Sequence, residues 1–367
     1  MVHRLRVIFL FGCFAAASGA GVAADQNDMR LPPDFIMDVF ADVPGARSLA
    51  LGDAGTVFVA GGSTGAVYAV IREDDDQQRV VKVASGLNWP NGIAVHDGDL
   101  YVAEISRVTK YRNLEASLAD VPVAEVLDIE LPSKSHHGRR YIDFGPDGKL
   151  YISIGAPCNV CEDAGFGEII RMNPDGSGRE TFAEGVRNSV GFSWHPLTSE
   201  LWFTDNGRDE LGDDRPPDEL NRARKTGLHF GFPYCHGGDI PDPDYGQGHD
   251  CDHYTAPAQK LGPHVAALGI AFYTGGMFPA DYREQLFIAE HGSWNRTEKS
   301  GHRVTLVRFD NGRPVSYETF ADGWLREEDG SVTGRPVDLL VLNDGSMLVS
   351  DDHAGKVYRI SYVGVRR

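Results

Sequence analysis

Six segments of the chain repeat one pattern, and this repetition constrains the fold more than any other feature. Each segment has an apolar alternating run, a tight turn of Asp and Gly, and a second apolar run that ends near an acidic residue or Gly. The segments span residues 49–60, 93–103, 142–154, 192–204, 270–289 and 337–350. Asp-Gly between alternating apolar runs is a strong signal for a β-hairpin. The pattern therefore predicts a hairpin in each segment.

The spacing of the repeats is typical of propeller blades. One residue in each second apolar run marks the repeat: Phe58, Tyr101, Tyr151, Trp202, Phe287 and Leu348. Successive markers are 43, 50, 51, 85 and 61 residues apart, and a four-stranded blade takes about 40 to 50 residues. The widest gap must hold an insertion. We place it at residues 230–263, a stretch rich in Gly, Pro and Asp.

We expect an all-β chain whose residues 25–367 form a single domain, a six-bladed β-propeller. A propeller closes radially and leaves no long open sheet edge. A β-sandwich or a solenoid with coincidental turns is the alternative.

The first 24 residues have the layout of a cleaved secretory signal peptide. Arg4 and Arg6 precede an apolar run at 7–17, and the small residues 22–24 precede a polar stretch. An N-terminal anchor is the alternative, but the apolar run is shorter than the roughly 20 residues that span a bilayer. No later segment is apolar enough to cross one. The sequence therefore predicts a periplasmic or secreted protein with no membrane partner.

The cysteine count agrees with export. Cys13 lies in the signal, which leaves four cysteines, and an even count in an exported chain indicates disulfides. We expect the local pairs Cys158–Cys161 and Cys235–Cys251. Redox or zinc chemistry is the alternative for the first pair. A c-type haem would need His at position 162, where the chain has Glu.

The formal net charge is −18 and becomes −20 once Arg4 and Arg6 leave with the signal. A surface this acidic repels nucleic acid and anionic lipid, so neither is expected as a partner. It is compatible with calcium binding.

Unusual polar residues occur at two equivalent places in the repeats. Before the first run come Asn91, His136, His137, Arg187, Asn188, His264 and Arg335; after the second come Glu104, residues 205–208, Glu290, His291 and residues 351–353. Because the second strand of a hairpin returns antiparallel, both sets lie at one end of the blade. They converge on one mouth, which is the default position for a binding site.

The chemistry of this mouth favours an anion and a hard cation. Arginine binds carboxylates and phosphates bidentately. Asp205, Asp218 and Glu219 offer the oxygen ligands that suit calcium rather than zinc. Each residue also has a structural interpretation: a lone His is more often structural than catalytic, and Arg187 could pair with Asp205.

Several motifs together resemble the PQQ-dependent sugar dehydrogenases, the soluble glucose and aldose enzymes and, more closely, the sorbosone dehydrogenase branch. The resemblance spans residues from about 87 to 360. Its motifs are residues 136–140 leading into 144–151, then 158–162, 185–191, 205–208 through 217–221, 273–275, 291–296 and 350–355. Members of this family are six-bladed propellers, in agreement with the repeat count.

The resemblance implies a role for each matching residue. His137 matches the catalytic base, with His136 or His291 next in line. Arg187 and Asn188 match the pair that holds the carboxylate and quinone oxygens of PQQ, and Gly207 and Arg208 match the carbonyls that bind its calcium. Asn91, Tyr273 and His291 are expected to line the cofactor site. The Lys that glucose dehydrogenases have near Tyr273 is missing, so Arg296 or Arg303 is expected to replace it.

The expected function is PQQ- and calcium-dependent oxidation of an aldose or a sorbosone-like sugar aldehyde to a lactone or acid. No Cys-x-x-Cys-His motif is present, so an external cytochrome or quinone is expected to accept the electrons. Two alternatives remain, a calcium-dependent lactonase and a non-catalytic propeller that binds a glycan or a protein.

Overall fold

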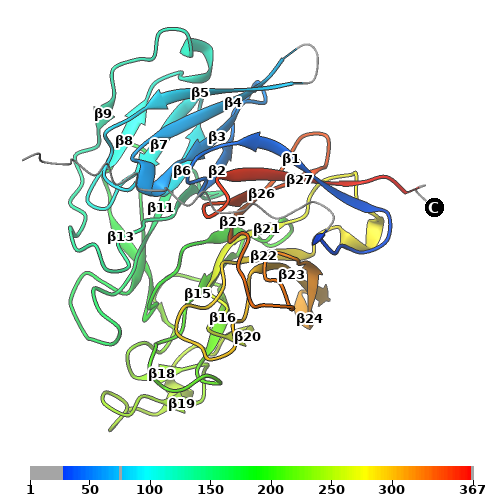
Figure 1. Ribbon diagram of the computed structural model, residues 1–367. Coiled ribbons are helices and arrows are strands. Elements are labelled where there is room, and N and C mark those ends of the chain that lie inside the picture. Colours follow the sequence, from blue (N-terminus) through cyan, green and yellow to red (C-terminus); the bar gives the residue numbers. More distant parts are fainter. Residues whose placement is uncertain (1–27, 74–76, 365–367) are drawn as a thin grey trace, which may run out of the picture.

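Six small sheets of mainly antiparallel strands form the blades of the protein in the computed structural model, which describes residues 28–73 and 77–364 (Figure 1). The first sheet contains β2 (Leu49–Leu51), β3 (Val57–Ala60), β4 (Val67–Arg72) and β5 (Gln78–Ala84). The second contains β6 (Gly92–His96), β7 (Asp99–Ala103), β8 (Val108–Tyr111) and β9 (Glu125–Val126). The third contains β10 (Ile142–Phe144), β11 (Leu150–Ile154), β12 (Glu168–Met172) and β13 (Glu180–Glu184).

In the remaining three sheets the strands follow one another in the same antiparallel way. The fourth contains β14 (Phe192–Trp194), β15 (Leu201–Asp205), β16 (Pro217–Ala223) and β20 (Gln259–Pro263). The fifth contains β21 (Ala267–Phe272), β22 (Leu286–Glu290), β23 (Arg303–Asp310) and β24 (Arg313–Ala321). The sixth contains β25 (Pro336–Val341), β26 (Met347–Asp351), β27 (Lys356–Tyr362) and β1 (Phe35–Asp42). The predicted all-β, six-bladed propeller is confirmed.

The predicted hairpins form the two inner strands of each blade. In the second blade Asp97 and Gly98 have φ values of +51° and +79° between β6 and β7. Positive φ at both central residues is what a tight hairpin turn of this kind needs. The described residues contain no α-helix, and their short 3-10 turns include η2 (Gly62–Thr64), η3 (Glu115–Ser117), η4 (Cys251–His253) and η5 (Ala280–Tyr282).

The N-terminal strand closes the ring. β1 pairs antiparallel with β27, with Met37 opposite Ile360, so the last blade joins residues from both ends of the chain. The ring of Phe35 also packs edge-on against Phe278 and Phe320, at centroid distances of 4.8 and 5.1 Å. Burying these rings stabilises the closure of the sixth blade on the fifth.

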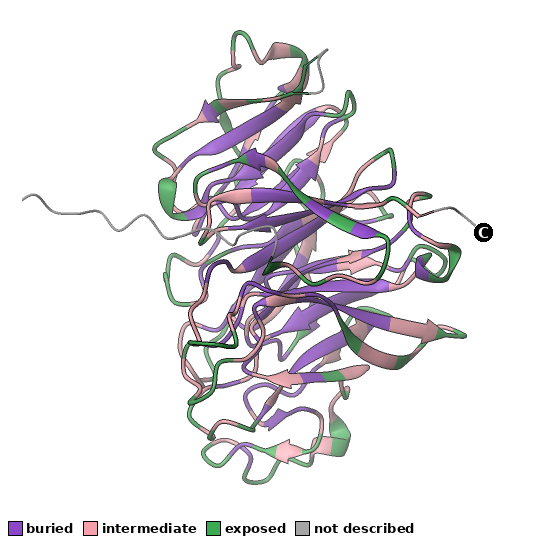
Figure 2. Cartoon of the chain, turned by 45° about the vertical axis from the view of Figure 1, so that its right-hand side comes forward, coloured by how far each residue is buried: buried purple, intermediate pink, exposed green. Residues whose placement is uncertain are grey.

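The core lies between neighbouring blades, where the faces of the sheets pack on one another (Figure 2). The inner strands are buried on both faces, and all five residues of β11 and of β26 are buried. This explains why the second runs of the repeats are almost continuously apolar. The exposed residues lie mainly in the loops and at the outer strands.

The predicted insertion lies between β16 and β20 of the fourth blade. It contains β17 (Leu228–His229), which pairs in parallel with β13 of the third blade, and the small hairpin of β18 (Cys235–His236) and β19 (Ile240–Pro241). The last five residues of the range proposed from the sequence are β20, the outer strand of the blade. The inserted segment therefore ends before Gln259.

Both predicted disulfides are present, Cys158–Cys161 and Cys235–Cys251. The predicted signal peptide lies outside the described residues. Within residues 28–73 and 77–364, no helix has the length and apolar character needed to span a membrane.

Candidate functional site

A cavity of about 450 Å³ opens at one end of the propeller, and loops of several blades form its walls. Its volume falls in the range of small-molecule sites, roughly 300 to 1,000 Å³. Its polar lining includes Arg47, His136, His137, Arg139, Arg187, Asn188, Asn206, Asp209, Asp218, His264, His291, Asn295 and Arg335. Most of these residues precede the first strand or follow the second strand of a blade.

His137 lies on the loop before β10 and is fixed by one hydrogen bond. Its Nδ1 lies 2.9 Å from the carbonyl oxygen of Ala156, and a carbonyl only accepts, so Nδ1 carries the proton and Nε2 keeps its lone pair. Burial and the positive charge of Arg187 together lower the pKa of His137 to about 2. The ring is therefore neutral near pH 7. Its Cβ packs against Gly155, where a side chain would come within 2.6 Å.

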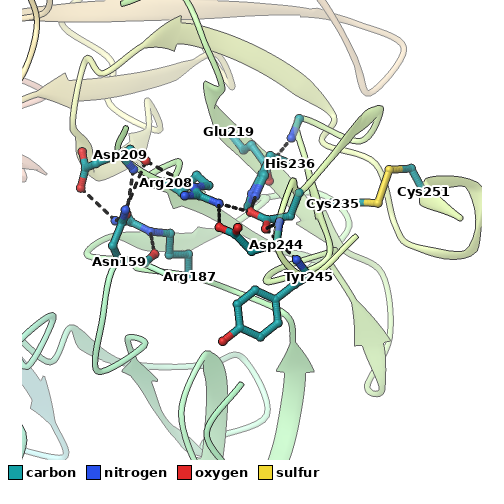
Figure 3. Close-up of polar contacts among 12 residues, drawn as sticks. Asn159, Arg187, Arg208, Asp209, Glu219, Cys235, His236, Asp244, Tyr245 and Cys251 are labelled. Carbon is teal, nitrogen blue, oxygen red and sulfur yellow. Dashed lines mark hydrogen bonds and ion pairs between the residues drawn. A yellow bond between two sulfur atoms is a disulfide. The ribbon is translucent and has the colours of Figure 1, made fainter. Parts of the chain in front are cut away.

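Arg187 is buried at the wall of the cavity and makes most of its hydrogen bonds within the protein. Its side chain donates to the carbonyls of Asn159 and Asn206 and to the side chains of Asn159 and Asp209 (Figure 3). The backbone N–H groups of Arg187 and Asn188 both donate to Asp205, at 2.8 and 2.6 Å. Arg187 therefore holds the loops of this wall together and also places a positive charge beside the cavity.

Three further arginines, Arg47, Arg139 and Arg335, line one side of the cavity, where the positive charge of Arg139 acts against those of Arg47 and Arg335. Arg47 is 1% exposed; its Nε donates to Asn91 and its Nη1 to Asp352, and its Nη2 has no hydrogen-bond partner within the described chain. Arg139 contacts the ring of Trp89 at 4.6 Å and makes no ion pair with any described residue. This side therefore presents guanidinium groups with free donors.

His291 and Asp352 connect this arginine group to the fifth blade. The Nε2 of His291 lies 2.8 Å from Asp352 Oδ1, while Arg335 donates to the carbonyls of His291 and Gly292. Burial lowers the pKa of His291 to about 4. His291 and Arg47 hold the pKa of Asp352 well below its usual range, so Asp352 remains charged.

The carboxylates predicted as metal ligands accept hydrogen bonds from N–H groups of the protein. Asp218 accepts from the N–H groups of Gly207 and Ala267, and Glu219 accepts from Gly237 N and Asn221 Nδ2. Asp205 is occupied in the same way by Arg187 and Asn188. Burial raises the pKa of Asp218 to about 6 and that of Glu219 to about 7.

No group of three or more His, Cys, Asp or Glu residues in the described ranges is arranged to hold a metal ion. The Arg208 side chain donates to Asp242, which directly follows β19 of the inserted hairpin. The backbone carbonyls of Gly207 and Arg208 accept no hydrogen bond within the described residues, and Gly207 lines the cavity.

Four residues predicted for the cofactor site do not line the cavity. Asn91 is fully buried behind Arg47 and donates to the Arg140 carbonyl. The side chain of Arg296 donates to Asp214, and that of Arg303 to Glu290. Tyr273 lies beyond β21, at the opposite end from Ala266, and its hydroxyl binds the backbone of Gly345, Met277 and Phe278. A six-residue strand of about 20 Å separates this tyrosine from the mouth.

Several cavity residues were missed in the sequence. Arg47 lies just before β2, in the stretch before the first strand of its blade where Arg187 and Arg335 lie in theirs. Aligning the first blade with the others could therefore have identified it. Arg139 belongs to the motif at residues 136–140, but the sequence predicted no role for it. Trp294 is 77% exposed at the rim, and no repeat position indicates it.

Comparisons with known proteins place the chain in a family. The model of the TrAA12-like family matches residues 34–363. A protein of Borreliella burgdorferi without a characterised function is 33% identical over 363 residues, which cover 94% of each chain.

Solved structures share the fold at lower identity. The Trichoderma reesei enzyme of carbohydrate-active family AA12 has a TM-score of 0.80 at 19% identity, with 95% of this chain and 100% of that chain covered. The PQQ domain of pyranose dehydrogenase from Coprinopsis cinerea has a TM-score of 0.78 at 16% identity, over 91% and 97%. The PQQ-bound aldose sugar dehydrogenase of Streptomyces coelicolor has a TM-score of 0.64 at 18% identity, over 90% and 99%.

These structures confirm the fold expected from the motifs, and the family model extends over nearly the whole propeller. The chain belongs to the TrAA12-like family.

Proposed function

We propose that the cavity binds PQQ and that the protein oxidises a sugar with it. The observation that carries the proposal is the arginine group: Arg47, Arg139 and Arg335 face the cavity, and the buried Nη2 of Arg47 lacks a partner within the described residues. A buried, unpaired donor is costly unless a ligand satisfies it. PQQ carries three carboxylates, and guanidinium groups are well suited to bind them. Two of the solved structures that share the fold are a PQQ domain and a PQQ-bound dehydrogenase.

His137 is proposed as the base that removes the proton of the sugar hydroxyl. Its Nε2 has a free lone pair because Nδ1 is held by Ala156. Negative charge bound beside Arg187 would offset that cation and raise the pKa of His137 toward its ordinary value. The chemistry that bound PQQ supplies is acceptance of a hydride from the sugar carbon.

Calcium is proposed as a second component of the site, with backbone carbonyl oxygens rather than carboxylates as its protein ligands. The carbonyl oxygens of Gly207 and Arg208 are free of hydrogen bonds within the described residues, and backbone carbonyls are ordinary calcium ligands. Asp205, Asp218 and Glu219 would act behind them by holding the loop backbone. A chelator should then lower activity, and calcium should restore it.

The proposed substrate is an aldose or a sorbosone-like sugar aldehyde, and the product a lactone or acid. The proposed electron acceptor is an external cytochrome or quinone. Export to the periplasm or the medium, as the N-terminal 24 residues indicate, fits such a partner.

The test is a dye-reduction screen of the purified protein with aldoses and sorbosone, with and without added PQQ and calcium. Sugar-dependent dye reduction that requires PQQ is the expected result. Lactone hydrolysis without PQQ would assign a calcium-dependent lactonase instead, and sugar binding without turnover would assign a binding propeller.

A further inference from the structure

The segment of residues 156–161, which follows β11 and which we call the strap, touches both proposed functional side chains. Its first residue, Ala156, accepts a hydrogen bond from His137 Nδ1 at 2.9 Å and donates its N–H to the Arg187 carbonyl at 2.7 Å. The strap belongs to the third blade, whereas Arg187 begins the fourth. It therefore fixes side chains of two blades relative to each other.

Asn159 is the centre of these contacts. Its carbonyl oxygen accepts from Arg187 Nε at 2.8 Å, and its Oδ1 accepts from Arg187 Nη2 at 2.9 Å. The same Oδ1 accepts from the N–H of Asp209 at 2.8 Å, and Nδ2 donates to the Asp209 carbonyl at 3.2 Å. One asparagine thus binds the guanidinium and the loop after β15 together (Figure 3).

The chain of contacts continues across the mouth. Asp209 Oδ2 accepts from Arg187 at 3.1 Å, and Asp209 Oδ1 accepts from Asn295 Nδ2 of the fifth blade at 2.6 Å. Asn159, Asp209 and Asn295 therefore link three blades at the edge of the cavity, and Asp209 and Asn295 line it.

The Cys158–Cys161 disulfide encloses Asn159 in a short covalent ring. A loop of this size without the crosslink samples many backbone conformations, and the crosslink removes most of them. The disulfide lies in the segment that touches Arg187 and His137, whereas Cys235–Cys251 lies in the inserted hairpin.

We propose that Asn159 is a positioning residue, held by the Cys158–Cys161 disulfide, that sets Arg187 and Asp209 for cofactor binding. This inference rests on the proposed function for its ligand, PQQ, but its structural part can be tested without it. The same segment fixes the tautomer of His137 through the carbonyl of Ala156. A change in the geometry of the strap should therefore also affect His137, the proposed base.

The first test replaces Asn159 with Ala and measures PQQ affinity by calorimetry. Without Oδ1, Arg187 and the Asp209 N–H lose their shared acceptor, so PQQ affinity should fall about 10-fold or more. Asn159→Asp keeps an acceptor for Arg187 and for the Asp209 N–H but loses the Nδ2 donor to the Asp209 carbonyl, so its PQQ affinity should fall less than that of Asn159→Ala. Asn173→Ala removes an exposed asparagine side chain of the same blade, which donates to Ser177, and should bind normally.

The second test needs no cofactor. Hydrogen exchange of the Asp209 amide, whose N–H is bonded to Asn159, should be faster in Asn159→Ala than in wild type. Replacing both Cys158 and Cys161 with Ser should speed the same amide, whereas the matched Cys235→Ser and Cys251→Ser pair should leave it unchanged.

The two measurements separate the two hypotheses. If wild-type protein does not bind PQQ, the proposed function fails, and the exchange of Asp209 still decides the role of Asn159. Unchanged exchange at Asp209 in Asn159→Ala, or wild-type PQQ affinity in that variant, would overturn the positioning role.

Discussion

At the scale of single residues, the cavity contains two kinds of arginine. Arg187 uses its donors on Asn159, Asn206 and Asp209, so its charge is held in the wall by the protein itself. Arg47 and Arg139 keep donors free, and one carboxylate, Asp352, accepts from Arg47. We therefore assign recognition of the ligand mainly to Arg47 and Arg139, for which the sequence motifs predicted no role.

Arg139 gives the cleanest test of this division, because it makes no hydrogen bond or ion pair with the described residues that a substitution would break. We expect Arg139→Gln to lower PQQ affinity roughly 10-fold or more, since one charge-assisted contact is lost, with little change in thermal stability. Calorimetric titration measures the affinity. Arg313, an exposed cation and the first residue of β24, provides the control: Arg313→Gln should bind normally. Equal affinity in both variants would remove Arg139 from the site.

The protonation state of His137 is a second residue-scale prediction. Its folded pKa of about 2 lies below the ordinary value of 6.5, because burial and Arg187 disfavour the imidazolium. In the cofactor-free protein, ¹⁵N NMR should therefore show a neutral ring with the proton on Nδ1 at every pH from 5 to 8. The His137→Gln spectrum identifies the resonance. A ring that titrates near pH 6.5, or one protonated on Nε2, is incompatible with the geometry described.

At the scale of elements, the N-terminal strand β1 closes the ring of blades. It supplies the outer strand of the last blade and packs Phe35 against the fifth blade. Met37 and Ile36 are neighbours on this strand, but Met37 is 6% exposed and Ile36 is 42% exposed. Successive residues of a strand face opposite sides of the sheet. Substitutions at these two positions therefore distinguish the contribution of side-chain burial from that of backbone pairing.

We expect Met37→Ala to destabilise the protein by about 2 to 5 kcal/mol, the range for truncating a buried side chain. Ile36→Ala should cost less than half as much. Chemical denaturation of the two variants measures the difference. Similar losses would mean that β1 contributes through its backbone pairing alone and does not close the ring by packing.

The inner hairpins could be predicted from the sequence because their signals are local. The alternating apolar runs and the Asp-Gly turns each lie within about a dozen residues. The pairing of β1 with β27 joins residues 35 and 362, and no local pattern encodes such a contact. The same distinction applies to the ends of the insertion, where β20 is set by pairing with β16.

Only part of the cavity could be predicted, because the repeat is a local signal and the orientation of the side chains is not. The repeat places loop residues such as His137 and Arg187 at one mouth, but it does not say where each side chain points. Asp205 and Glu219 turn toward N–H donors of the protein, and Tyr273 anchors a loop at the far end of its blade. These outcomes depend on tertiary contacts between blades.

At the scale of the whole molecule, the formal charge of −18 contrasts with the arginines of the mouth. A cationic cavity in an acidic protein concentrates the local field where an anionic cofactor would bind, and leaves the rest of the surface repulsive to other polyanions. Ring closure brings loops from several blades to this one place, so a single domain suffices to assemble the site.

The central claim is that this cavity oxidises sugar with PQQ, and a single-turnover measurement tests it most directly. PQQ-loaded protein is mixed with aldoses and with sorbosone in the absence of any electron acceptor, while the absorbance of the oxidised cofactor is followed. We predict that a substrate sugar removes this absorbance at up to one equivalent per protein molecule. We also predict that His137→Ala slows the change by about 10² to 10⁴. Stable PQQ binding with no sugar-dependent change in absorbance would contradict the account.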